Sequence, residues 1–409
     1  MTPFALSAIL MSLVALASWL NAMTLKLPRG VAMLLVGLIG AVAVFGLEMF
    51  VPGLGISEVV AHIDFASTVT DYMLAFLLFA GAMQVDLAEL RKRWASVGAL
   101  ATLGVGASIL IVGCGLWLVA GAVGATLPLT WSLVFAALIS PTDPVAVLAT
   151  VRHVRLSKAL TVTLQGEALF NDGVGIVAFY ALLALASGTG DIDPTGAVLE
   201  VFIAALGGLV LGMVAAWAVI KAMATLDDFV VETSMSIALA MAVYAGAQAL
   251  HLSGAIAAVG AGMLFGGPRA RKAMEGETEV YLRHFWELVD EILNAVLFLL
   301  LGVELLAVPF RPRWLGLMAA AIPLVVAARF AVVLPWGTFY RRWRAQKGAT
   351  AILGWGGLHG ALSLALALSL PASPYRAIIL AVTYAVVIFS IAVQGLSFAP
   401  LARRFQSAE

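Results

Sequence analysis

The sequence predicts an all-α polytopic membrane protein, and three observations support that fold class. The chain has 409 residues, of which 63% are hydrophobic, and its mean hydropathy is +1.05. Only 11% of the residues are charged, whereas a soluble domain carries roughly 25%. Apolar runs of about 20 residues, the length that a helix needs to cross the hydrocarbon core, recur along the whole chain. A membrane β-barrel is rejected because runs such as 319–333 are apolar on all sides and lack period-two alternation.

The apolar runs predict about thirteen transmembrane helices. The first run lacks a basic start and a clean small-residue cleavage site, so we interpret it as a retained helix and not as a signal peptide. Because only 251–253 separates the eighth run from the ninth, a count of twelve or fourteen stays open. The predicted spans are 4–23, 29–47, 67–85, 95–121, 128–151, 159–187, 196–222, 229–250, 253–267, 284–306, 314–337, 349–370 and 376–398.

The distribution of basic residues predicts the orientation. Nineteen of the 23 lysines and arginines fall in loops on one side of the predicted membrane. By the positive-inside rule these loops are cytoplasmic, which places the N-terminus outside and the C-terminus in the cytoplasm. The expected location is the plasma membrane, which in a bacterium is the inner membrane. The net charge is zero and neither a long basic tract nor a P-loop is present, so neither nucleic acid nor a nucleotide is an expected partner. The single cysteine, Cys114, excludes an intrachain disulfide.

The fifth span contains Ser140-Pro141-Thr142-Asp143-Pro144. Each proline lacks an N–H group and clashes with the carbonyl one turn earlier, so the helix should break here at mid-membrane. Broken backbone at this depth is tolerated only where it is buried in protein or lines a cavity. A simple proline kink is the alternative, but Thr142 and Asp143 coincide with the break and favour an ion site.

The sixth span contains Glu167, Asn171 and Asp172 within six positions. Ionisable residues at membrane depth are costly and usually functional. Glu167 and Asp172 lie about 140° apart around a helix, so we expect them to have different partners and different roles. A purely structural polar cluster is the alternative for both residues. Arg329 lies in the eleventh span, and because a guanidinium stays charged it needs a carboxylate. We predict Glu167 as that partner, in a structural ion pair.

Two further spans carry polar residues that are possible modulators. The twelfth span contains Gly354-Trp355-Gly356-Gly357-Leu358-His359-Gly360, and four glycines in seven positions weaken a helix. A second broken helix, equivalent to the fifth, is the pattern of an inverted-repeat transporter. His359 is either a proton relay or a residue that bonds a neighbouring backbone group. In the tenth span Asp290 and Asn294 share a face, where they line an ion entry funnel or pack between helices.

These motifs resemble those of the monovalent cation/proton antiporter-1 family, of the NhaP type, over nearly the whole chain. The sequence differs from the family pattern at Ala168, where serine is common, and at His359, where arginine is usual. The residues that carry the resemblance are Thr142-Asp143-Pro144, Glu167-Ala168-Leu169-Phe170-Asn171-Asp172-Gly173, Leu77-Leu78-Phe79-Ala80-Gly81, Phe298-Leu299-Leu300-Leu301-Gly302 and Trp355-Gly356-Gly357-Leu358.

The resemblance implies an inverted-repeat antiporter fold of thirteen helices, with helices 5 and 12 interrupted, in a homodimer. It implies that residues 1–90 (helices 1–3) form the first part of a dimerisation domain, and that residues 191–310 (helices 7–10) form a dimerisation and linker part. Residues 91–190 (helices 4–6) and 311–400 (helices 11–13) would form a core that moves as an elevator. Residues 401–409 would be a short cytoplasmic tail.

The resemblance also implies a function, electroneutral exchange of one Na⁺ or Li⁺ for one H⁺, with no cofactor. It carries ion and proton binding to Asp172 and Asp143, an oxygen ligand to Thr142, and the mark of the electroneutral branch to Asn171. Na⁺ would bind at Asp172, Asp143 and Thr142, and Glu167 with Arg329 would form the ion pair.

The mechanism that we predict is competition, because one carboxylate can bind a cation when ionised and a proton when neutral, but not both. A water-exposed aspartate has a pKa of about 3.9 and would hold no proton at neutral pH, so Asp172 must be desolvated. Three alternatives stay open: a K⁺/H⁺ antiporter, a cation channel, and an intramembrane hydrolase that uses Asp143 and Asp172. A filter of glycine carbonyls is not visible in the sequence, and aspartyl hydrolysis would need two adjacent carboxylates that share a water molecule.

Overall fold

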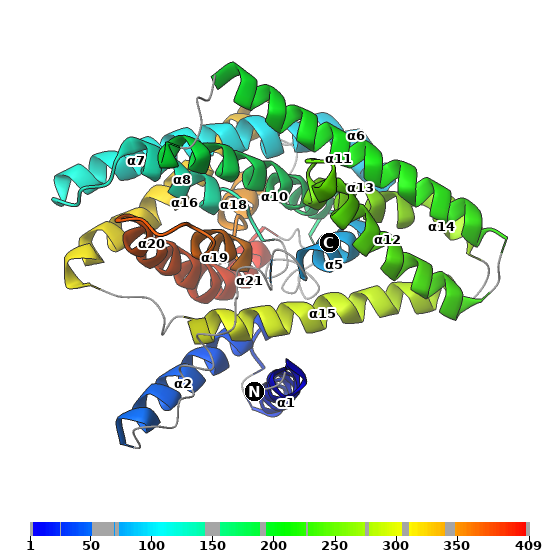
Figure 1. The fold of residues 1–409 in the computed structure, drawn as a ribbon, viewed down its shortest axis with the longest axis horizontal. Helices are drawn as coiled ribbons and strands as arrows, with labels where there is room; N and C mark the ends of the chain where they lie inside the picture. The colour runs from blue at the N-terminus through cyan, green and yellow to red at the C-terminus, as the bar shows by residue number, and fades with distance from the viewer. Residues whose placement is uncertain are drawn as a thin grey trace.

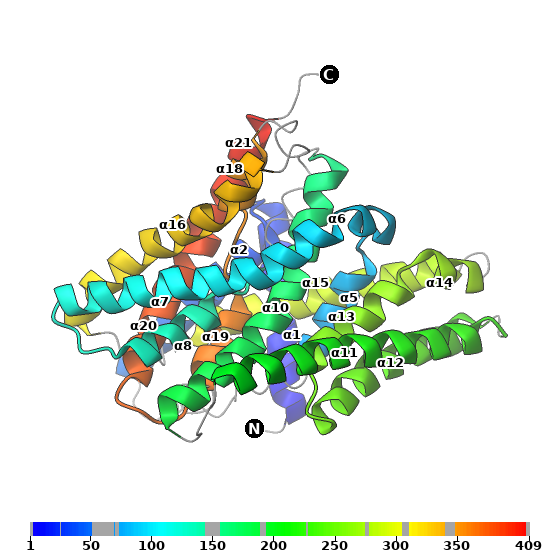
Figure 2. The same ribbon diagram turned by 90° about the horizontal axis from the view of Figure 1, so that it is seen from above.

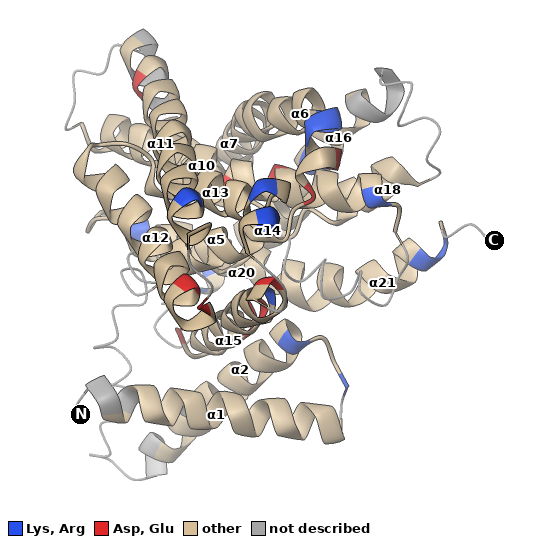
Figure 3. Cartoon of the chain, turned by 90° about the vertical axis from the view of Figure 1, so that its right-hand side faces the viewer, with Lys and Arg blue, Asp and Glu red and all other residues tan. Residues whose placement is uncertain are grey.

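A computed structural model of the chain describes residues 3–24, 26–50, 69, 73–143, 156–188, 194–225, 228–274, 278–304, 311–339 and 348–405. The described residues are helical with no strand, as the composition predicts. Six described helices are long and apolar enough to cross a membrane, and several shorter helices are equally apolar. Figure 3 shows α1 without a charged residue along its described length. Many large apolar side chains on these helices are exposed, as expected of a surface that faces lipid.

The helices follow the predicted spans. The helices before residue 190 are α1 (Pro3–Met23), α2 (Arg29–Phe50), α5 (Leu74–Met83), α6 (Leu87–Ala99), the π-helix η2 (Leu100–Gly104), α7 (Val105–Ala122), α8 (Leu129–Ile139) and α10 (Lys158–Ser187). The next helices are α11 (Pro194–Met223), α12 (Phe229–Ala249), α13 (Gly254–Phe265), α14 (Pro268–Ala273) and α15 (Thr278–Glu304). The last helices are η4 (Pro312–Trp314), α16 (Leu315–Phe339), α18 (Ala349–Trp355), α19 (Ala361–Leu368), α20 (Arg376–Phe389), the π-helix η5 (Ser390–Gly395) and α21 (Leu396–Arg403).

Every predicted span contains described helical structure, and the number of complete membrane crossings stays a prediction. The fourth span is one continuous helix, α6–η2–α7, which Figure 2 shows running along one side of the bundle. The twelfth is divided into α18 and α19 by the turn and the non-helical backbone of 356–360. In the fifth, α8 ends at Ile139, and 140–143 are not helical. The rest of the fifth span, including Pro144, lies outside the described residues.

The helices pack in two groups, within which contacts are denser than between them. The first group, called here the scaffold helices, comprises α1, α2, α5, α11, α12, α13 and α15, with close pairs α2/α15, α5/α13 and α11/α13. The second group, called the core helices, comprises α6, α7, α8, α10, α16, α18, α19, α20 and α21. In Figure 1, α15 runs along the bundle above α1 and α2, while α8, α10 and α19 lie in its centre. The two interrupted spans belong to the core helices.

Candidate functional site

The two interrupted helices meet at their breaks. The backbone N–H of Asp143 donates to the carbonyl oxygen of Leu358 at 2.7 Å. On the other side, Nδ1 of His359 lies 3.3 Å from the carbonyl oxygen of Pro141. Each break therefore supplies a partner to the other, because an unpaired backbone group in a membrane interior is costly. The contact brings together two segments that are more than two hundred positions apart in the chain.

Asp143 lies against the start of a half-helix. Gly360 is the residue before α19, and a Cβ atom built on it would lie 2.5 Å from Oδ2 of Asp143. The carboxylate thus occupies space that only glycine leaves open. The unsatisfied N–H groups at a helix N-terminus favour a negative charge, so this position suits an ionised Asp143.

Thr142 and Asn171 join the break to α10. Nδ2 of Asn171 donates to Oγ1 of Thr142 at 2.8 Å, and the backbone N–H of Thr142 donates to Oδ1 of Asn171 at 3.3 Å. Both side chains are buried. This pair of hydrogen bonds fixes the non-helical segment 140–143 against the helix that carries Asp172.

Asp172 is partly buried, between the buried Asn171 and Gly173. Gly173 packs so closely on Ile256 of α13 that a Cβ atom would collide with that side chain. The carboxylate of Asp143 is near enough to act electrostatically on Asp172. The two aspartates predicted from sequence therefore lie at one site, where α10 passes between the broken fifth span and α13.

Asp290 extends this acidic group towards the scaffold helices. The charge of Asp143 also acts on Asp290, and the polar side chain of Gln84, at the end of α5, is a neighbour of the Asp290 carboxylate. Nδ2 of Asn294 donates to Oδ1 of Asp290 at 2.9 Å. Gln84 did not emerge from the sequence, because one glutamine at the end of an apolar run has no distinctive spacing.

Glu167 and Arg329 form a buried ion pair away from Asp172. Both terminal nitrogens of Arg329 reach the carboxylate, one of them at 2.9 Å, and the side chains are 11% (Arg329) and 3% (Glu167) exposed. Nε and Nη2 of Arg329 also donate to the carbonyl oxygen of Leu353, each at 3.2 Å. That carbonyl lies near the end of α18, where the break leaves it without a helical partner. Arg329 thus ties α16 to α10 and to α18.

Ser390 and Gln394 complete the second break and were not among the predicted residues. The backbone N–H of His359 donates to Oγ of Ser390 at 2.8 Å, and this hydroxyl donates to Oε1 of Gln394 at 2.9 Å. Both polar residues lie in the π-helical segment η5, and π-bulges often mark functional sites. The sequence signal that could have found them is their spacing, since Ser390 and Gln394 are polar and lie four positions apart in an apolar span. His359 is buried and bonds neighbouring backbone, which is the simpler of its two predicted roles.

Across the described part of the chain, no group of three His, Cys, Asp or Glu side chains is arranged to hold a metal ion. Hydroxyl groups, backbone carbonyls and water are, with carboxylates, the oxygen ligands that suit hard cations.

Comparison with known proteins identifies the family. The family model described as "Sodium/hydrogen exchanger, transmembrane" matches residues 9–404. The chain belongs to the sodium/hydrogen exchanger family. This agrees with the resemblance inferred from the sequence, and it makes the chain an integral membrane protein of a transporter family.

Curated relatives of this exchanger are named as antiporters. The Na⁺/H⁺ antiporter NhaP of Pseudomonas aeruginosa is 39% identical over 99% of the chain and 97% of its own length. The Na⁺/H⁺ antiporter NhaH of Halobacillus aidingensis is 32% identical over 93% of the chain and 92% of its own length. Among solved structures, the sodium/proton antiporter MjNhaP1 of Methanocaldococcus jannaschii superimposes with a TM-score of 0.75 at 20% identity, covering 98% of both chains. The structural likeness supports the antiporter fold.

Proposed function

We propose that the chain exchanges H⁺ for Na⁺ or Li⁺ across a bacterial plasma membrane, one for one and without net charge movement, and that the cation and the proton compete for Asp172. The observation that carries the proposal is the meeting of the two broken helices beside Asp143 and the Asn171-Asp172 pair. The antiporter names of the full-length relatives support Na⁺ as the cation.

The geometry suggests how the cation binds. The break after α8 exposes the negative end of that half-helix, and its free carbonyl groups favour a cation. Asp143 and Asp172 supply carboxylate oxygens, and Thr142 supplies a hydroxyl or carbonyl oxygen. Asn171 already bonds Thr142, so its role is to hold that ligand in place. Asp290, Gln84 and Asn294 extend the polar path and would attract cations to the site.

Competition at one carboxylate couples the two ions without another energy source. A carboxyl group that is partly removed from water, close to a second carboxylate, holds a proton more readily than an exposed one. Protonated Asp172 is neutral and would not bind Na⁺, whereas ionised Asp172 would bind Na⁺. Each half-cycle then carries one positive charge, either H⁺ or Na⁺, in opposite directions.

The alternating-access motion that we propose is an elevator movement of the core against the scaffold. We assign residues 91–190 and 311–400 to the moving core, and residues 1–90 and 191–310 to the dimerisation part of a homodimer, except that the start of α6 (Leu87–Leu90) would move with the rest of that core helix. The denser packing within each helix group supports that division. The Glu167–Arg329 pair would keep α10, α16 and α18 together during the movement. The N-terminus would be outside and the C-terminus in the cytoplasm, as the basic loops indicate.

The test is proton flux in proteoliposomes that carry an imposed pH gradient, with Na⁺, Li⁺ and K⁺ added in turn. Na⁺ or Li⁺ should dissipate the gradient, and clamping the membrane potential should leave the rate unchanged. Dissipation by K⁺ alone would favour a K⁺/H⁺ antiporter, and flux that follows the membrane potential would favour a channel.

Asp172→Asn should abolish exchange while the protein remains folded in the membrane. Glu291→Gln is a matched control, because Glu291 is a carboxylate on α15 in a largely exposed ion pair with Arg29. Exchange retained by Asp172→Asn would remove Asp172 from the central role.

A further inference from the structure

An apolar pocket lies at the boundary between a core helix and a scaffold helix. Its volume is about 420 Å³. Leu90 and Val97 of α6 and Phe170 of α10 line it from the core side, and Met263 of α13 lines it from the scaffold side. It is separate from the ion site described above, since it contains none of that site's polar residues. Pockets of this size typically accept a ligand with substantial apolar surface.

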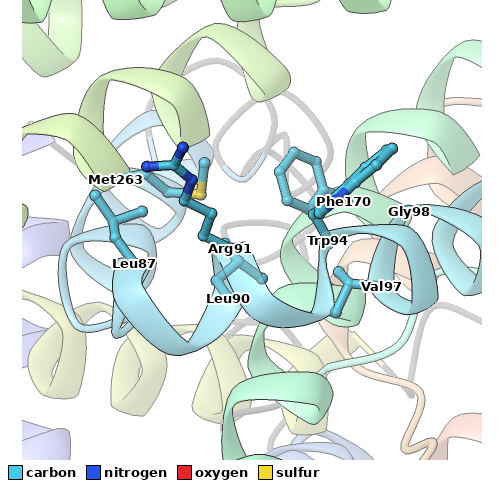
Figure 4. Close-up of a pocket in the computed structure, with 8 residues that line it drawn as sticks. All are labelled: Leu87, Leu90, Arg91, Trp94, Val97, Gly98, Phe170 and Met263. Atoms are coloured by element: carbon cyan, nitrogen blue, oxygen red, sulfur yellow. The ribbon is translucent and has the colours of Figure 1, made fainter.

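The rim of the pocket has the character of a membrane interface. Trp94 is 72% exposed, and tryptophan is enriched where headgroups meet hydrocarbon. In Figure 4, Arg91 and Met263 lie at one end of the pocket, and the rings of Trp94 and Phe170 lie at the other. The pocket therefore combines an apolar interior with one cation and one interfacial aromatic residue.

Arg91 differs from its two basic neighbours. Lys92 and Arg93 both pair with Glu89, at 3.0 Å each. Arg91 is exposed, and the described part of the chain offers it no acidic partner. Among the described residues that line the pocket, Arg91 is the only cation. An exposed guanidinium beside an apolar pocket is suited to a ligand that joins a phosphate group to an apolar chain.

We propose that this pocket binds one acyl chain of an anionic phospholipid, with the lipid phosphate on Arg91. The charge of Arg91 selects an anionic headgroup, and the lining of Leu90, Val97, Phe170 and Met263 accepts the chain. The lipid would bridge α6 and α13, which belong to the two units that the proposed elevator movement separates. The binding claim goes beyond the proposed exchange and does not depend on it.

The experiment uses the purified full-length chain in nanodiscs of phosphatidylcholine with a trace of photoactivatable lipid. The probe carries a diazirine in one acyl chain, on either a phosphatidylglycerol or a phosphatidylcholine headgroup, and labelled peptides are mapped by mass spectrometry. We expect the phosphatidylglycerol probe to label residues 87–98 and the peptide that contains Met263 several-fold more than the phosphatidylcholine probe. Equal labelling by both probes, or no labelling of these peptides, would overturn the proposal.

Matched variants separate the headgroup contact from the acyl-chain contact. Arg91→Gln should reduce labelling by phosphatidylglycerol to the phosphatidylcholine level, whereas Lys92→Gln should leave it unchanged. A Cβ atom at Gly98, which lines the pocket, would have open space around it, so Gly98→Leu should fill the pocket and remove labelling. Gly106 also has open space on the same long helix but lies outside the pocket, so Gly106→Leu is the control. Unchanged labelling in both Arg91→Gln and Gly98→Leu would overturn the proposal, whatever Asp172→Asn does to exchange.

Discussion

The closest glycine contacts differ between the scaffold helices and the core helices. On the scaffold, a Cβ atom on Gly212 would collide with the backbone carbonyl of Ala257, and one on Gly302 would lie 2.5 Å from the carbonyl oxygen of Leu34. In the core, a Cβ atom on Gly115 would instead meet the Cδ1 atom of Leu324 at 2.6 Å. At Gly212 and Gly302, the scaffold pairs α11/α13 and α2/α15 therefore pack backbone against backbone, although Gly30 of α2 meets the ring of Phe298. At Gly115, the core pair α7/α16 packs backbone against a side chain.

The difference indicates where the molecule is rigid. Small residues at a membrane helix interface let backbones approach closely, and such a contact cannot relax by a change of rotamer. Side-chain contacts can relax in that way. The core instead has polar groups at its centre. There the two broken helices are joined by the bond from Asp143 to Leu358, and the first break is joined to α10 by the bond from Thr142 to Asn171. A rigid scaffold around a core joined by side chains is consistent with the movement that we propose.

The largest effect is expected when the core's buried ion pair is broken. Arg329→Ala leaves Glu167 as a buried charge without its cation, which typically costs about 3–5 kcal/mol. It also removes two hydrogen bonds to Leu353. We expect a marked loss of folded yield and of thermal stability in detergent.

The control for Arg329 is Arg29, which pairs with Glu291 at an exposed site where the side chains are 65% (Arg29) and 35% (Glu291) exposed. Arg29→Ala should change the melting temperature little, because exposed ion pairs contribute at most about 1 kcal/mol. If Arg329→Ala matched Arg29→Ala in yield and stability, the structural role of Arg329 would be wrong.

The next effect tests the two uses of glycine directly. Alanine is favoured over glycine in a helix interior by about 1 kcal/mol at both Gly212 and Gly115. Gly212→Ala forces two backbones apart and should destabilise the protein by about 1–3 kcal/mol, the range for overpacking. Gly115→Ala displaces only the end of Leu324 and should be close to neutral. Equal melting temperatures for the two variants would contradict the distinction between the regions.

A smaller effect on stability, but a specific one on transport, is expected at Gly360. A methyl group there would overlap the Asp143 carboxylate while leaving the helices on either side intact. We expect Gly360→Ala to weaken the apparent affinity for Na⁺ about tenfold, which corresponds to ~1.4 kcal/mol. The measurement is the Na⁺ dependence of exchange in proteoliposomes, with Gly106→Ala as the control. Unchanged Na⁺ affinity would show that Asp143 is not held as a ligand by this contact.

The sequence could predict the helices, both breaks and the aspartates, because each depends on local chemistry. Pro141 has no backbone N–H group to donate in any conformation, and the glycines between Gly354 and Gly360 weaken any helix. Partners from distant spans were harder to predict. Arg329 was matched to Glu167 because charges at membrane depth are few, so little choice remained.

Functional residues whose type and spacing resemble those of many other residues in the chain could not be predicted. Ser390 and Gln84 are ordinary polar side chains, and only the three-dimensional path of the chain shows that they face His359 and Asp290. The pocket beside Arg91 is formed by three separate helices and has no local sequence pattern at all. The two glycine classes depend in the same way on which helix lies opposite.

The smallest effect is expected at an exposed tie between two core helices. Nζ of Lys158, the first residue of α10, lies 2.5 Å from Oδ2 of Asp86. The other carboxylate oxygen, Oδ1, accepts a hydrogen bond from the backbone N–H of Glu89 at the start of α6. The hydrogen bond from Lys158 and then that from Glu89 lower the pKa of Asp86. A carboxyl group whose pKa is lowered by folding stabilises the folded state above its unfolded pKa of about 3.9, and this contribution is lost as the pH falls through the folded-state value. A double-mutant cycle of Asp86→Asn and Lys158→Gln, followed by thermal unfolding, should therefore show a small coupling at pH 7 that decreases as the pH is lowered to 3 and below. A coupling that stays as large below pH 3 as at pH 7 would mean that the two residues interact by packing and not through charge.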